Sequence, residues 1–144
     1  MVRVIHASHR TGDSMRLIIP GEPIPKQRPR VTRNGAYTPA KTKNAEKEIQ
    51  IMAQLETYAP IEGNVKMTVI AYFKIPKSKT VREKQLMREG KIRPTKRPDW
   101  DNIGKLVSDA LNKITYNDDS QIVEAHVSKW YSDTPRTEII VEGI

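Results

Sequence analysis

The chain has 144 residues, no cysteine and a net charge of +8. A chain of this length forms one domain, and the absence of cysteine excludes disulfides and thiolate zinc sites. No apolar run approaches the roughly 20 residues of a membrane-spanning helix, and the N-terminus lacks a secretory signal pattern, so we expect a cytoplasmic protein.

The positive charge is concentrated in two segments. Residues 1–43 carry nine Lys/Arg against two acids and residues 74–97 carry ten against two, whereas residues 98–144 carry four against nine. The basic residues alternate with Pro, Thr, Asn, Gly and Tyr instead of lying on helix faces, which suits loops that follow a polyanion. Solvated surface loops are the ordinary explanation of such charge runs. The composition nevertheless favours nucleic acid as the partner.

The N-terminal part of the chain is predicted to form an arm and then a short strand. Residues 1–14 show no sustained period and precede a second methionine, Met15, so we expect an appended or poorly ordered arm. The folded domain is expected over residues 15–144, beginning with a strand over Arg16–Ile19.

A long basic loop follows this strand. Residues 20–40 hold five of the ten prolines and no repeating apolar pattern, which is typical of a loop. Asn34-Gly35 is predicted to form a turn within it.

The middle of the chain is predicted to contain two helices and one strand. A helix capped by Thr42 or Asn44 is expected to run to about Tyr58. Residues 64–74 are rich in β-branched and aromatic residues, with apolar and polar positions alternating, and predict a central strand. A short helix is expected near residues 80–89.

The clearest predicted element is a helix that follows Asp101. Apolar residues recur at i, i+3, i+4, i+7, i+8 and i+11 from Ile103 onward, which is one helix face. Asp101 or Asn102 is expected as the N-cap. Residues 121–131 and 136–142 alternate apolar and polar, which predicts a hairpin or paired strands. The order β-α-β-α-α-β-β predicts an α+β domain with a mixed sheet of about four strands.

Four acids in two short segments of this basic chain suggest a divalent metal site that faces a phosphate backbone. If this segment is extended, Asp99 and Asp101 are expected to project from the same side of it, and two close carboxylates repel each other unless a proton or cation lies between them. Mg²⁺ usually takes one or two protein carboxylates, with water and phosphate completing its shell. We expect Asp99, Asp101 and Asp119 to surround the metal. The alternatives are that Asp101 only caps the helix and that Asp118-Asp119 only build a turn.

Lys105 lies four residues after Asp101, on the side of the predicted helix opposite its apolar stripe. It either forms an ordinary i, i+4 ion pair or reaches the scissile phosphate, and the spacing favours neither. Asp109, one turn further, is expected to be a partly buried structural acid without a catalytic role. The chain has no phosphate-binding loop or dinucleotide fingerprint, so no nucleotide cofactor is expected.

The motifs of this chain resemble the RusA family of Holliday-junction resolvases, which are common in bacteria and their prophages. The similarity covers residues 15–142 and rests on RPDWDNIGKLVSDAL, on NDDSQIV and on the opening segments GEPIPKQRPRV and YTPAKTK. The resemblance implies a homodimeric, Mg²⁺- or Mn²⁺-dependent endonuclease that nicks opposing strands of a four-way DNA junction in recombination and repair.

Carried over by position, the resemblance implies that Asp99, Asp101 and Asp119 bind the metal and that Lys105 is the essential lysine. Asp118 matches a neighbouring acid of the family, and which of the two adjacent acids is the ligand stays open. A non-catalytic DNA- or RNA-binding module and a flap or general branched-DNA nuclease are the alternative functions. We expect the basic loops to contact the junction arms through Lys26, Arg28, Arg30, Arg33, Lys41, Lys43, Lys96 and Arg97.

Overall fold

The computed structural model describes residues 3–4, 13–27, 30–37 and 39–144. The principal elements follow the predicted order β-α-β-α-α-β-β, with a short strand and a small hairpin added near the N-terminus. The elements are β1 (Arg3–Val4), β2 (Ser14–Pro20), β3 (Arg30–Thr32), β4 (Gly35–Tyr37), α1 (Ala40–Glu56), β5 (Val65–Lys74), α2 (Val81–Arg88), α3 (Trp100–Leu111), the 3₁₀ helix η1 (Asp119–Gln121), β6 (Ile122–Ser132) and β7 (Arg136–Gly143).

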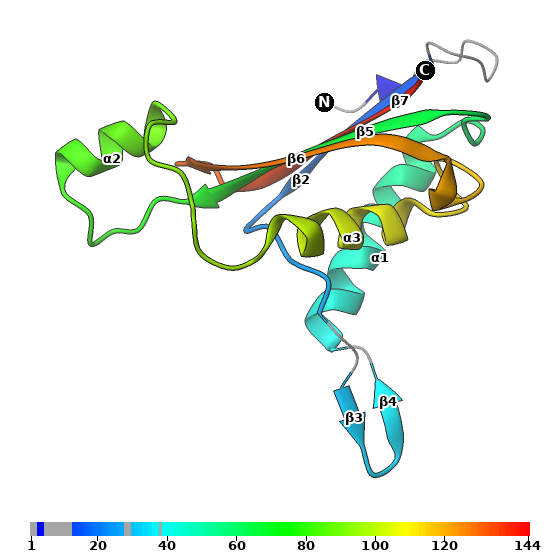
Figure 1. Ribbon diagram of the computed structural model, residues 1–144, viewed down its shortest axis with the longest axis horizontal. Helices are drawn as coiled ribbons and strands as arrows, with labels where there is room; N and C mark the ends of the chain where they lie inside the picture. Colours follow the sequence, from blue (N-terminus) through cyan, green and yellow to red (C-terminus); the bar gives the residue numbers. More distant parts are fainter. Residues whose placement is uncertain (1–2, 5–12, 28–29, 38) are drawn as a thin grey trace.

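One mixed sheet forms the body of the molecule. Its strands lie in the order β1-β2-β7-β5-β6, and only the β5–β6 pair is parallel. Helices α1 and α3 lie side by side on one face of this sheet, α2 lies beyond one end of it, and the β3–β4 hairpin projects away from it (Figure 1). The predicted α+β class and the mixed sheet of four principal strands are therefore confirmed.

The core lies between the sheet and the two helices that cover it. Every second residue of β2, β5 and β7 is buried, as the alternating sequence predicts. Leu17, Ile139 and Val69 are cross-strand neighbours in this layer, and none of them is exposed to solvent. The apolar stripe of α3 packs on the same layer, and its buried members are Ile103, Leu106, Val107, Ala110 and Leu111.

Ile139→Ala is expected to lower the free energy of unfolding by about 2–5 kcal/mol, because it opens a cavity between two buried neighbours on adjacent strands. Ile139→Val, the matched control, removes one methyl group and is expected to cost about 0.5–1.5 kcal/mol. Urea unfolding followed by far-UV circular dichroism measures both. A loss below about 1 kcal/mol for the alanine variant would show that the contacts of Ile139 with Leu17 and Val69 are not central to the core.

The predicted pairing of the last two strands is wrong. Strands β6 and β7 do not pair with each other, because β5 lies between them and bonds to both. β6 runs parallel to β5, and the short connection after Ser132 brings the chain back as β7 on the other side of β5. Apolar alternation indicates that a segment is a strand, but it does not identify the neighbouring strand.

The predicted helix starts are also wrong by a few residues. Helix α3 begins at Trp100 with Asp99 at its N-cap position, and the Ile103 amide already donates to the Asp99 carbonyl at 3.2 Å. Helix α1 begins at Ala40, so Thr42 lies inside it. The Thr42 hydroxyl is buried and bonds to the loop over residues 25–27 instead of capping the helix.

The N-terminal predictions are only partly covered by the described residues. Strand β2 begins at Ser14, one residue before the expected start of the domain, and β1 pairs with it, while residues 5–12 lie outside the described part. The division into an arm and a domain therefore stays a prediction. The predicted loop over residues 20–40 contains the β3–β4 hairpin. Its turn is formed by Arg33 and Asn34, one residue earlier than the predicted Asn34-Gly35, and Gly35 begins β4 at a φ of 118°. None of the helices in the described ranges is both long and apolar enough to cross a membrane.

Candidate active site

The N-terminal turn of α3 carries the first acids of the site. Asp99 occupies the N-cap position, yet its side chain makes no capping hydrogen bond, and Asp101 lies in the first helical turn. Gly104 lets this turn approach β6 closely, since a Cβ atom there would lie 3.2 Å from the Val127 Cγ2 atom. The apolar stripe of α3 therefore holds the acidic turn beside the edge strand of the sheet.

An open hollow between α3 and β6 brings together three of the predicted site residues. Asp101 and Lys105 line it from α3, and Asp119 lines it from the start of η1. Trp100, which is 63% exposed, lies at the same hollow, and the remaining lining residues are Met67, Gly104, Ser108, Ile122, Ala125 and Val127. Asp99 does not line this α3–β6 hollow, although it is two residues from Asp101.

The carboxylates of Asp99, Asp101 and Asp119 have no hydrogen-bond or ion-pair partner among the described residues. Within that part of the chain, no three His, Asp or Glu side chains are close enough to enclose a metal ion. The structure therefore brings Asp101 and Asp119 to one hollow and leaves Asp99 beside it, and it does not assemble a closed three-acid cage. Two carboxylates suffice for a Mg²⁺ ion whose other ligands are water and phosphate.

Asp118 has a local structural role. Its Oδ2 atom accepts from the Ser120 amide at 3.0 Å, which makes it the N-cap of η1. Hydrogen bonding by Ser120, helped by the charge of Lys113, lowers the pKa of Asp118 below its ordinary value. The expectation that this acidic pair builds local backbone structure therefore applies to Asp118, while the neighbouring Asp119 carboxylate, at the hollow, is unpaired as far as the described ranges extend.

Gln121 fixes the short segment that presents Asp119. Its side-chain oxygen accepts from the amides of Asn117 and Asp118 at 2.8 and 3.0 Å. Its side-chain nitrogen donates to the carbonyls of Ile61 and Gly63, both at 2.9 Å. One amide thus ties η1 to the segment before β5, which sets the place of Asp119 relative to α3.

Gln121→Met is expected to lower the free energy of unfolding by about 1–3 kcal/mol, because it leaves four backbone groups without their partner. Gln85→Met is the matched control, since the Gln85 amide makes one exposed bond to Glu89, and this variant should change stability by less than about 0.5 kcal/mol. Chemical denaturation measures both. Equal stabilities of the two variants would contradict the anchoring role.

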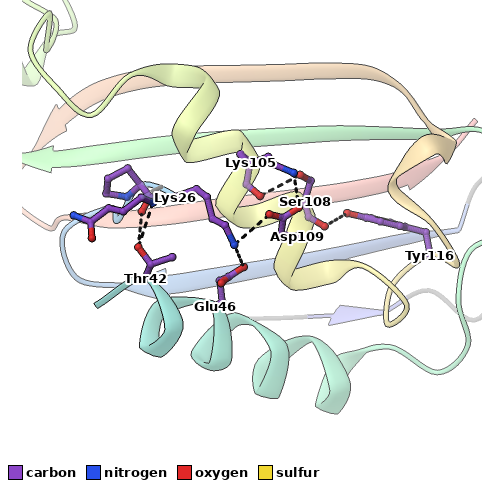
Figure 2. A network of polar contacts seen from close by, with 9 residues as sticks. Lys26, Thr42, Glu46, Lys105, Ser108, Asp109 and Tyr116 are labelled. Carbon is purple, nitrogen blue, oxygen red and sulfur yellow. Dashed lines mark hydrogen bonds and ion pairs between the residues drawn. The ribbon is translucent and has the colours of Figure 1, made fainter. Parts of the chain in front are cut away.

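Lys105 belongs to a network of charged side chains on the helix-covered side of the sheet (Figure 2). Its Nζ atom lies 3.0 Å from Asp109 Oδ1 and makes no pair with Asp101. Lys26 Nζ lies 3.3 Å from Asp109 Oδ2 and 3.0 Å from Glu46 Oε2. Burial lowers the pKa of Lys26, but the hydrogen bonds and charges of Glu46 and Asp109 outweigh it, so the pKa lies above its ordinary value. Two lysines and two acids therefore neutralise one another.

Tyr116 connects the last turns of α3 to the segment that leads to Asp119. Its hydroxyl is buried and donates to the Ser108 carbonyl at 2.7 Å (Figure 2). Burial raises its pKa well above the ordinary value, and the negative charges of Asp119 and Asp109 add to this effect. The phenol therefore stays protonated and acts as a structural donor beside the hollow.

The basic residues predicted to bind DNA fall into two groups. Arg33, Lys41, Lys43, Lys96 and Arg97 are exposed, and none of them has an acidic partner among the described residues. Lys26 is 25% exposed and is held in the charged network. Arg28 lies outside the described residues, and so does the side chain of Arg30.

Sequence reasoning missed Lys129, which holds the segment that leads into Asp99. From β6, its Nζ atom donates to the carbonyls of Lys96 and Pro98 at 2.6 and 2.8 Å. Arg93 donates to the Lys129 carbonyl and lies over the Trp130 ring, 3.3 Å from its centroid. No pattern in the sequence marks these contacts, because they join segments more than 30 residues apart. Gln121, by contrast, lies within the segment NDDSQIV, on which the family resemblance rests.

Comparison with known proteins identifies the class of molecule that carries this site. The model of the protein family named endodeoxyribonuclease RusA matches residues 20–142 of this chain. The chain is also 39% identical over 139 residues to YqaN of Bacillus subtilis (strain 168), an uncharacterized protein, covering 92% of this chain and 98% of that protein. The protein is thus an endodeoxyribonuclease. It belongs to the RusA family, whose members are Holliday-junction resolvases, and the alternative of a non-catalytic binding module is set aside.

Proposed function

We propose that this nuclease resolves four-way DNA junctions by paired nicks and depends on a divalent cation, Mg²⁺ with Mn²⁺ as a substitute. One observation carries the proposal: Asp101, Lys105 and Asp119 line a single open hollow, and both carboxylates lack partners among the described residues. A carboxylate that is not neutralised by a nearby lysine or arginine, even in a chain of net charge +8, remains available to bind a cation.

The donor set fits a hard cation. Asp101 and Asp119 offer carboxylate oxygens, which Mg²⁺ and Mn²⁺ prefer, and Asp99 offers a third from the adjoining N-cap position. Such a cation, when bound, activates water and offsets negative charge on the reacting phosphate. Lys105 would donate hydrogen bonds to a phosphate oxygen, and Trp100 would shield one side of the hollow from water. Asp118, occupied as a helix cap, takes no part in binding the ion.

The exposed basic residues would hold the DNA around this hollow. Lys96 and Arg97 directly precede the acidic turn of α3, while Arg33 lies on the projecting hairpin, and Lys41 and Lys43 lie on the first turn of α1 (Figure 1). Their unpaired charges can follow phosphates without first breaking an ion pair. A homodimer is proposed as well, because two-fold symmetry places two identical sites against two equivalent strands.

A comparison of branched and linear substrates tests this proposal. Equal concentrations of a four-way junction, a flap and a linear duplex are incubated with the protein and Mg²⁺, and the cut positions are mapped on each labelled strand. Preferred cutting of the junction, at symmetric positions on opposing strands, is expected. Preferred cutting of the flap would assign the protein to the general branched-DNA nucleases. Analytical ultracentrifugation of the free protein tests the dimer, and a purely monomeric species would contradict it.

A further inference from the structure

The charged network beside the α3–β6 hollow contains one acid, Asp109, that has no role in the proposed cleavage reaction. Asp109 is 22% exposed and contacts two ammonium groups through its two oxygens, Lys105 at 3.0 Å and Lys26 at 3.3 Å. Lys26 is itself fixed, because its backbone amide donates to the Asn102 carbonyl at 2.8 Å and its side chain also pairs with Glu46. Asp109 is therefore held on both sides (Figure 2).

Lys105 lies midway between two acids of the same helix. Asp101 precedes it by four residues and Asp109 follows it by four, so both acids are within reach of its ammonium group. An acid on the N-terminal side of a lysine is intrinsically the better i, i+4 partner, which favours Asp101 in an isolated helix. In the structure the lysine pairs with Asp109, and the Asp101 carboxylate at the hollow has no partner within the described part of the chain.

We propose that Asp109 is a positioning residue that holds Lys105 away from Asp101 and thereby keeps the Asp101 carboxylate open for the metal ion. This inference rests on the proposed function. Without the negative charge of Asp109, the Lys105 ammonium turns to its other neighbour, forms a pair with Asp101 and competes with the cation. The rest of the network supports the assignment, because Lys26 and Glu46 neutralise each other and keep Asp109 in place without entering the hollow.

Mn²⁺ titration followed by electron paramagnetic resonance tests the inference on the full chain without DNA. Asp109→Asn is expected to weaken Mn²⁺ binding about two- to threefold, the size of one helical ion pair that now competes. In a Lys105→Met background, the same change is expected to have less than half of that effect, because the competing ammonium group is gone. Asp109→Glu, which keeps the charge, should restore wild-type affinity. Glu46→Gln is the control that removes an ion pair of Lys26 and leaves Lys105 with its partner.

The outcomes separate this inference from the function on which it rests. Wild-type affinity in Asp109→Asn, or an equal loss with and without Lys105, would overturn the positioning role while leaving the metal site standing. Failure of the wild-type protein to bind Mn²⁺ would overturn the metal site itself and the positioning role with it. If Asp109→Asn unfolds, shown by circular dichroism, the comparison of Asp109→Glu with Asp109→Ser at equal protein stability decides, with the serine variant expected to show the loss.

Discussion

Asp101→Asn is expected to reduce cleavage of four-way junctions by at least about a hundredfold, because loss of a partner that merely orients a metal ligand already costs 10- to 100-fold. The fold should survive, since Asp101 is exposed in the first turn of α3 and none of its side-chain atoms bonds within the described residues. The loss of a favourable charge at the helix start costs only about 0.3–1 kcal/mol. Single-turnover cleavage in excess Mg²⁺ measures the rate.

Binding separates this result from a loss of DNA affinity. Gel-shift or anisotropy titration in the absence of a divalent ion should give the same junction affinity for Asp101→Asn and for wild-type protein, because the basic contacts are untouched. Asp133→Asn is the matched control: this exposed acid pairs with Arg88, away from the α3–β6 hollow, and its variant should cut at the wild-type rate. Full activity of Asp101→Asn would remove Asp101 from the metal site.

Replacement by asparagine is expected to affect the cleavage rate strongly at Asp119 and only slightly at the adjacent Asp118. Asp119→Asn should lower cleavage at least about a hundredfold, for the reason given for Asp101. Asp118→Asn should stay within about threefold of wild type, because asparagine caps a helix about as well as aspartate and the Ser120 amide keeps its acceptor. The pair thereby tests which acid completes the metal site.

A third variant separates the capping role from chemistry. Asp118→Ala removes the acceptor for Ser120 and should cost about 0.5–2 kcal/mol of stability, with a smaller loss of cleavage than Asp119→Asn. Thermal unfolding and single-turnover rates are compared for the three proteins. The assignment would be reversed if Asp118→Asn lost activity while Asp119→Asn kept it.

The elements with strong periodic patterns could be predicted from the sequence. Helix α3 and strand β5 lie where their apolar periods place them, because each buries one face against the same core. Helix ends were less predictable. Asp101 has the residue type of a cap, yet α3 starts earlier, since the Asp99 carbonyl already accepts the first helical hydrogen bond.

The strand pairing and the contacts of Lys129 depend on the tertiary arrangement, which the hydrophobic pattern of the sequence did not reveal. The pairing of β6 with β5, instead of with β7, depends on how the chain passes the end of β5 and leaves no local signature. Lys129 contacts the backbone carbonyls just before Asp99 from a strand more than 30 residues further along the chain, so residue spacing alone could not reveal this contact.

The candidate site was predictable in its residue types but not in its pairings. The acidic segments and Lys105 stand out in a basic chain, and Asp101, Lys105 and Asp119 do line one hollow. Spacing could not decide between Asp101 and Asp109 as the partner of Lys105, because both are four residues away. In the structure the partner of Lys105 is Asp109, a partly buried acid that also pairs with Lys26 from a distant loop.

Cleavage of a supercoiled plasmid that extrudes a cruciform tests the central claim most directly, because paired nicks across one four-way junction convert the circle to a linear molecule. The expected result is linear product in Mg²⁺ or Mn²⁺, none in EDTA, and none with Asp101→Asn. Plasmid that stays intact with the wild-type protein at every Mg²⁺ and Mn²⁺ concentration would contradict the assignment of a metal-dependent junction resolvase.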